Sequence, residues 1–119
     1  MRYMFLVYSK EMPDIRPEDL EDVTRRHGAV LAEATDKGVL LGADPLHPTS
    51  SAKTVRTNNG KASILDGPFA ETKEQLAGYY MIDCRNLDEA LEWAKKIPSG
   101  CKGGEGCIEV RPVREIRKS

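Results

Sequence analysis

The sequence lacks long apolar runs and carries almost no net charge. No uncharged apolar stretch approaches the ~20 residues of a membrane-spanning helix. Residues 1–8 are too short for a signal peptide and lack its basic region and cleavage site. The formal net charge of −1 argues against a protein that binds nucleic acid through bulk charge. We therefore expect a cytoplasmic protein that binds neither a membrane nor nucleic acid.

Cysteine and histidine are also scarce. The chain has three cysteines, Cys84, Cys101 and Cys107. An odd number of cysteines in a chain without a secretory signal predicts reduced thiols. Their spacing is not that of zinc ligands, and the two histidines lie far apart along the chain. We expect structural or redox-inert cysteines, rather than a metal site or a regulated disulfide.

Motifs for acyl transfer and nucleotide binding are missing as well. The sequence has no Gly-x-Ser-x-Gly elbow and no phosphate-binding P-loop. Residues 99–106 are rich in glycine, but they precede an expected strand rather than a helix N-terminus, so the geometry of an anion site is absent. We interpret them as a flexible loop.

What is present suits one small soluble domain over residues 1–119, with 39% hydrophobic and 31% charged residues. A first helix is expected from Pro17 to about Asp36, with Gly38 as its stop. Its apolar stripe comprises Leu20, Val23, His27, Val30, Leu31 and Ala34.

A second helix is expected over residues 87–97, where Asn86 and Glu89 match a capping box. A similar pair, Thr72 and Gln75, predicts a short helical turn. Strands are expected over residues 2–8, 39–43, 52–57, 61–65, 78–84 and 107–116. The two central short strands form a hairpin, because Asn59-Gly60 is typical of a type I′ turn.

This order predicts an α+β fold of the ferredoxin-like βαβ-βαβ type with an extra hairpin. Its antiparallel sheet carries both helices on one face. The strands at 2–8 and 78–84 are apolar on both faces, so something else must cover the second face. A second copy of the chain is the simplest answer, and we expect a homodimer packed sheet to sheet.

Two residues are candidates for chemistry. Asp66 ends a strand and is aimed by the rigid turn of Gly67 and Pro68, and His27 lies in the helix stripe that faces the sheet. On spacing alone, His27 is more simply a core histidine bonded to a carbonyl, and Asp66 more simply an aspartate that bonds its own turn. The other interpretation is a His27 that moves a proton while Asp66 holds it.

A family resemblance bears on this choice. The segment DGPFAETKEQLAGYY at residues 66–80 resembles the signature of the YCII-related family, in its DGPF-motif branch. The likeness continues through residues 87–90 and 108–113, the opening strand and the Arg-His-Gly at 26–28, so it covers nearly the whole chain. Ala77, where the branch more often has glycine, is a small departure.

The resemblance implies a dimeric α/β-barrel and an active site made from a helix histidine and an aspartate, here His27 and Asp66. It also implies an association of such proteins with extracytoplasmic-function sigma factors. We therefore expect a small enzyme that needs no cofactor. His27 would act as general acid and base on a small-molecule ligand, Asp66 would orient it, and Phe69 and Tyr80 would line an apolar pocket.

Two alternatives stay open. The same pocket could serve a non-catalytic ligand-binding or sigma-factor-associated regulatory module, or the chain could be a purely structural dimer. Nothing in the sequence names a substrate or a reaction.

Overall fold

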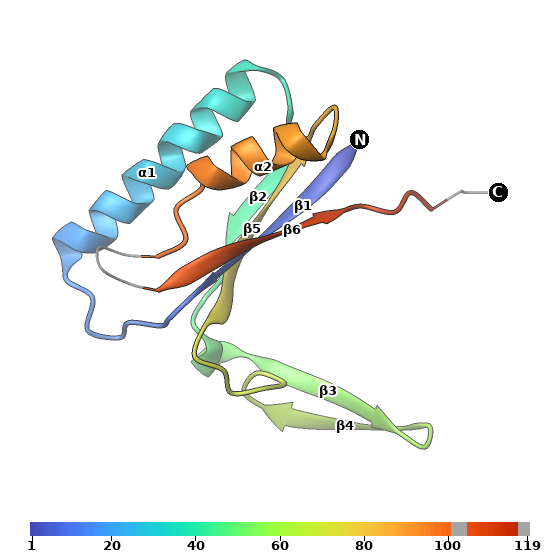
Figure 1. Cartoon of the computed structure of the whole chain (residues 1–119). Coiled ribbons are helices and arrows are strands. Elements are labelled where there is room, and N and C mark those ends of the chain that lie inside the picture. Colours follow the sequence, from blue (N-terminus) through green and yellow to red (C-terminus); the bar gives the residue numbers. More distant parts are fainter. Residues whose placement is uncertain (101–104, 117–119) are drawn as a thin grey trace.

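The chain folds as a four-stranded sheet with two helices and a separate hairpin (Figure 1), in a computed structural model that describes residues 1–100 and 105–116. The elements are β1 (Arg2–Ser9), α1 (Pro17–Asp36), β2 (Leu40–Pro45), the 3-10 turn η1 (Thr49–Ser51), β3 (Lys53–Asn58), β4 (Lys61–Asp66), β5 (Gln75–Asp83), α2 (Leu87–Lys96) and β6 (Gly106–Pro112).

The sheet has the order β2-β5-β1-β6, and each neighbouring pair is antiparallel. With the hairpin set aside, this is the strand order of a ferredoxin-like fold, and the predicted fold class is confirmed. The long central pair β1–β5 keeps Phe5 opposite Tyr80 and Leu6 opposite Tyr79. This register decides which side chains meet the helices and which do not.

Both helices cover the same face of the sheet, as the ribbon shows (Figure 1). Alternate residues of β1 and β5 point into this helical layer, because successive strand residues face opposite ways. The buried set is Tyr3, Phe5, Val7, Val30, Ala34, Tyr80, Ile82, Cys84, Ala90, Trp93 and Ile97. The core therefore lies between the helices and one face of the sheet.

The opposite face of the sheet is partly exposed and rich in apolar side chains. Met4, Leu6 and Tyr8 of β1 alternate with the buried residues, as do Tyr79 and Met81 of β5. Both strands are thus apolar on two faces, as expected, and nothing in residues 1–100 or 105–116 forms a layer over one of these faces. We call this surface the open face.

The helix ends follow the sequence signals. Helix α1 begins at Pro17, and Gly38 beyond its end has a φ of +71°. The Asn86 side chain accepts a hydrogen bond from the Glu89 amide, as the capping box predicts. The apolar stripe of α1 is shorter than expected, because Leu20 near its start is 52% exposed.

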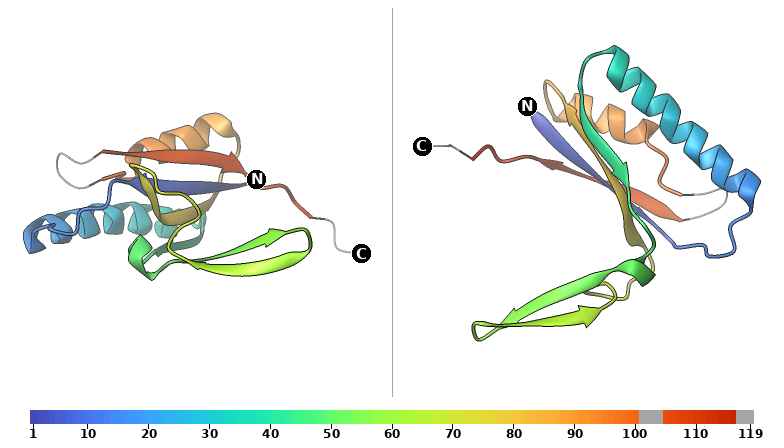
Figure 2. Two further views of the ribbon diagram at one scale, coloured as in Figure 1. Left: turned by 90° about the horizontal axis from the view of Figure 1, so that it is seen from below. Right: turned by 180° about the vertical axis from the view of Figure 1, so that it is seen from behind.

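Strands β3 and β4 pair with each other and form a separate two-stranded sheet. At their tip Asn59 and Gly60 both have positive φ, which confirms the expected turn. This hairpin, which we call the arm, extends away from the helices (Figures 1 and 2). The radius of gyration is consequently 16.2 Å, against about 13.5 Å for a compact domain of this length.

Two elements of the structure differ from those predicted from the sequence. The capping box at Thr72 and Gln75 does not start a helical turn: the Thr72 hydroxyl donates to the Glu74 carbonyl at 2.6 Å and the Gln75 amide to the Ala70 carbonyl at 3.1 Å. These bonds stabilise a loop that leads into β5. The last strand ends at Pro112, whose ring removes a ladder donor.

No helix in the described ranges is long and apolar enough to cross a membrane.

Candidate functional site

His27 of α1 meets Tyr80 of β5 between the helix layer and the sheet. The imidazole Nδ1 lies 2.7 Å from the Tyr80 hydroxyl oxygen, and the rings stack at 5.9 Å between centroids with 24° between planes. A separation of 2.7 Å is a good hydrogen-bond length. The predicted histidine and one of the predicted pocket residues are therefore in contact.

Helical and strand periodicity bring the two rings together. His27 precedes Val30 by three residues on the face of α1 that packs against the sheet, and Val30 is buried. Tyr80 and Ile82 are two residues apart and share the helix-facing side of β5, where Tyr80 is 4% exposed. A tyrosine buried to this degree needs a partner for its hydroxyl, and the helix supplies an imidazole.

Burial keeps both rings uncharged. Desolvation, followed by the positive charge of Arg26, lowers the pKa of His27 from its ordinary value of 6.5. Desolvation raises the pKa of Tyr80 to about 12. At neutral pH the site is therefore a neutral imidazole bonded to a neutral phenol.

The second imidazole nitrogen of His27 is Nε2. Among the described residues no protein group hydrogen-bonds to it, and no buried side-chain nitrogen or oxygen lacks a partner. Since the His27 side chain is only partly buried, Nε2 is the nitrogen left for a contact outside the described residues. One nitrogen of His27 is bonded to Tyr80, and the other has no partner in the part of the chain that the structure describes.

Asp66 lies elsewhere in the chain. It ends β4 in the arm, its carboxylate forms an ion pair with the Lys53 ammonium, and its side chain is 86% exposed. No contact in the structure joins Asp66 to His27. Their pairing stays a prediction, and in a single chain each has a different partner.

Phe69 follows the arm and is 79% exposed. Tyr80 is buried against His27, so within one chain these two predicted pocket residues have opposite surroundings. A pocket lined by both rings stays a prediction.

Two surface cavities lie away from these residues. One, of about 610 Å³, runs between α1 and the end of α2 and includes Arg26 and Pro98. The other, of about 520 Å³, lies beside Cys84 and Trp93. Neither is lined by His27, Tyr80, Asp66 or Phe69.

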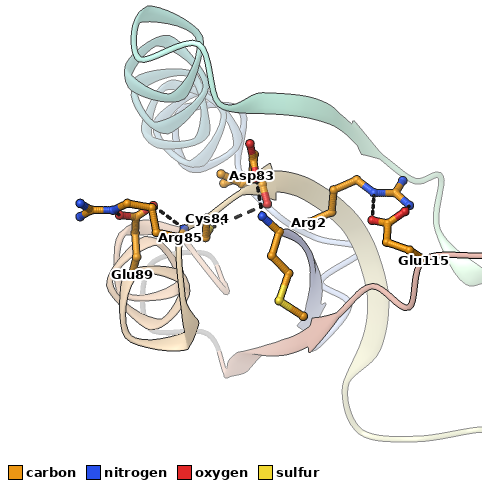
Figure 3. A network of polar contacts seen from close by, with 8 residues as sticks. Arg2, Asp83, Cys84, Arg85, Glu89 and Glu115 are labelled. Atoms are coloured by element: carbon orange, nitrogen blue, oxygen red, sulfur yellow. Dashed lines mark hydrogen bonds and ion pairs between the residues drawn. The ribbon is translucent and has the colours of Figure 1, made fainter.

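The cavity beside Cys84 is bordered by paired charges. Figure 3 shows the Arg85 guanidinium on the Glu89 carboxylate, 2.6 Å apart, next to Cys84. The Lys96 ammonium lies 4.8 Å from the centre of the Trp93 ring and is also paired with a glutamate. The charges named here therefore already have partners within the described part of the chain.

Neither of the two cysteines that the structure describes, Cys84 and Cys107, has a lowered thiol pKa. Burial raises the pKa of Cys84 to about 11, and burial followed by hydrogen bonding to Glu74 raises the pKa of Cys107. Cys101 lies outside the described residues. Across the two described ranges no group of three or more histidine, cysteine, aspartate or glutamate side chains could hold a metal ion.

Sequence reasoning missed the hydroxyl of Tyr80 as the partner of His27. The sequence analysis predicted Tyr80 only as an apolar lining residue of the pocket. The signal was present: alternation along β5 puts the Tyr80 phenol on the buried face, and a buried phenol requires a hydrogen-bonding side chain on the helix above it.

Comparison with known proteins places the chain in a family. The YCII-related domain matches residues 1–117. An uncharacterized protein of Rhizobium meliloti (strain 1021) is 42% identical over 115 residues, which cover 95% of this chain and 92% of that protein. The chain belongs to the YCII-related domain family.

Proposed function

We propose that this protein is a small enzyme without a cofactor, in which His27 exchanges a proton or a hydrogen bond with a small metabolite. One observation carries the proposal. His27 has one nitrogen fixed by Tyr80 and the other without a partner among the described residues, and its charge is suppressed by burial. A half-buried imidazole of this kind can act on a ligand at neutral pH.

The proposed reaction class is proton transfer, elimination or lyase chemistry, since these need an acid or base and no electron carrier. The catalytic role of Asp66 stays a prediction. Its carboxylate would have to leave Lys53 and approach His27, either by movement of the arm or from the arm of a second chain.

The test is a screen of small oxygenated and aromatic metabolites, read by thermal shift for binding and by mass spectrometry for products. Wild type is compared with His27→Gln, in which the amide can still bond the Tyr80 hydroxyl. The matched control is His47→Gln, because His47 is exposed and outside the site.

We expect a product that depends on His27 and not on His47. Binding without product, lost in His27→Gln, would support the ligand-binding module. Equal turnover by wild type and His27→Gln would contradict any catalytic role for this residue.

We further propose that the protein is a homodimer through the open face. Met4, Leu6 and Tyr79 give this face an apolar surface that the described parts of the chain leave uncovered. A four-stranded face with about seven residues a strand has a plan area of roughly 450 Å². Stable interfaces bury about 800 Å² per partner, so the arm, with Val55 and Ile64 exposed, is expected to add to the contact.

Light scattering after size exclusion tests the dimer. Leu6→Lys places an ammonium on the open face opposite Glu109, its cross-strand neighbour, so the single chain can tolerate it. We expect it to yield monomers, while Leu91→Lys on the partly exposed face of α2 leaves the dimer intact. A wild-type protein that is monomeric at micromolar concentration contradicts this proposal.

A further inference from the structure

Tyr80 decides which nitrogen of His27 carries the proton. We propose that Tyr80 is a positioning residue that donates its hydroxyl proton to Nδ1, so that resting His27 presents an Nε2–H to its ligand. This inference rests on the proposed role of His27: it makes the resting Nε2 a hydrogen-bond donor to the ligand rather than a base, and so adds the kind of atom that the ligand must offer.

The direction of the bond follows from the needs of the Tyr80 hydroxyl. At 4% exposure this O–H has to donate within the protein. Within residues 1–100 and 105–116 it has two acceptors nearby, both on His27: Nδ1 at 2.7 Å and the backbone carbonyl oxygen at 3.5 Å. An O–H donor bonds at 2.5–3.0 Å as a rule, so the carbonyl is too far and Nδ1 is the acceptor.

The tautomer follows from that direction. A nitrogen that accepts a hydrogen bond carries no proton, and a neutral imidazole has one N–H, which must then be on Nε2. Nε2 is the ring nitrogen that has no hydrogen-bond partner among the described residues. The Nε2 edge of His27 is therefore a hydrogen-bond donor in the resting protein.

Charging His27 would reverse the bond. An imidazolium needs an N–H on Nδ1, which would make Tyr80 the acceptor and leave its own proton to the carbonyl at 3.5 Å. The neutral donor form thus fits the geometry better than the cation. This agrees with the burial and the neighbouring Arg26 charge, which act in the same direction.

A neutral N–H donor selects a ligand by chemistry. It matches an acceptor oxygen such as a carbonyl, a carboxylate or an enolate, and in a partly buried position it stabilises negative charge that develops on that oxygen. We therefore assign the ligand to oxygenated metabolites that place such an oxygen on Nε2. A ligand that offers only a donor to Nε2 would require the other tautomer.

The test is long-range ¹H–¹⁵N NMR of the two histidines at a pH above their titration, in wild type, Tyr80→Phe and Tyr79→Phe. Tyr79 is the matched control, because its hydroxyl bonds Asp44 on the open face at 2.7 Å. Wild type should show a pyridine-type Nδ1 and a pyrrole-type Nε2 on His27. Tyr80→Phe should shift the Nδ1 resonance downfield through loss of the bond, while His47 and the Tyr79→Phe spectrum stay unchanged.

A pyrrole-type Nδ1 in wild type, or a His27 spectrum that Tyr80→Phe leaves unchanged, overturns the inference. The experiment needs no substrate. The tautomer assignment can thus fail while His27 remains essential in the metabolite screen, and it can hold where that screen finds no turnover.

Discussion

The four-stranded sheet and the arm both consist of antiparallel strands but have opposite surroundings. Phe5 and Ile82 in the sheet are fully buried beneath two helices, whereas Val55 and Ile64, cross-strand neighbours in the arm, are 63% and 75% exposed. The strands of both regions pair through backbone hydrogen bonds. Only the four-stranded sheet also buries much apolar surface away from water, and this burial supplies most of the stability of a fold.

The difference is that the apolar side chains of the arm are not covered by any other described part of the chain. A hairpin of two strands is marginally stable alone in water, and β4 is exposed along its whole length. One face of the arm carries three cross-strand pairs in order: Lys53 with Asp66, Val55 with Ile64, and Thr57 with Ala62. Anything that covers the apolar pair would also cover the Asp66 carboxylate.

The largest expected effect comes from opening a cavity in the core. Phe5→Ala should lower the free energy of unfolding by about 3–5 kcal/mol, because the site is fully buried. Ile64→Ala in the arm should change it by no more than about 0.5 kcal/mol in a monomer. Urea denaturation at low protein concentration measures the free energy of unfolding of both variants.

Repeating the comparison of Phe5→Ala and Ile64→Ala at several protein concentrations tests whether the arm docks on a second chain. If the arm docks on a second chain, the loss in Ile64→Ala grows with protein concentration, because dimerisation then contributes to stability. Equal losses in the two variants at every concentration would show that the arm is part of the core.

An intermediate effect is expected at the glycines of the two regions. A Cβ at Gly78 of β5 would lie 2.8 Å from the Asp44 carbonyl oxygen of the neighbouring strand, so Gly78→Ala should cost about 1–3 kcal/mol. Gly60 at the arm tip has open space and a φ of +77°, so Gly60→Ala strains only the turn. Hydrogen exchange should show faster exchange confined to the arm in Gly60→Ala, and a lower global stability in Gly78→Ala.

A smaller effect is expected from pH. The folded protein has a lowered His27 pKa, so below about pH 6.5 the unfolded chain binds more protons at this residue. The free energy of unfolding should therefore fall as the pH is lowered through about 6.5. The slope between pH 7 and 5.5 should be weaker in His27→Gln than in His47→Gln, as measured by urea denaturation at each pH. A stability that rises on acidification in this window would contradict the lowered pKa.

The sequence predicted most of the fold because its signals are local. Pro17, the Asn86 cap and the Asn59-Gly60 turn each set a boundary through nearby backbone geometry, and two-residue alternation identified the two-faced strands. The turn expected at Thr72 failed because its side chains bond loop carbonyls rather than a helix start.

The site was harder to predict because its contact is not local. His27 and Tyr80 are far apart in sequence, and only the packing of α1 on β5 shows that a hydroxyl meets the imidazole. The Asp66-Gly67-Pro68 turn made Asp66 the expected partner of His27, and the resemblance to the YCII-related family implied the same pair. A contact that involves a second chain has no signature in spacing, so the role of Asp66 could not be decided from sequence.

The most direct test of the account is the pH titration of His27 by NMR, in wild type and in Asp66→Asn. The account predicts a midpoint below 6.5 that is the same in both proteins, since burial and Tyr80 govern His27. A midpoint above 6.5 that falls in Asp66→Asn would contradict it, and would show that the carboxylate of Asp66 holds the imidazole in its charged form.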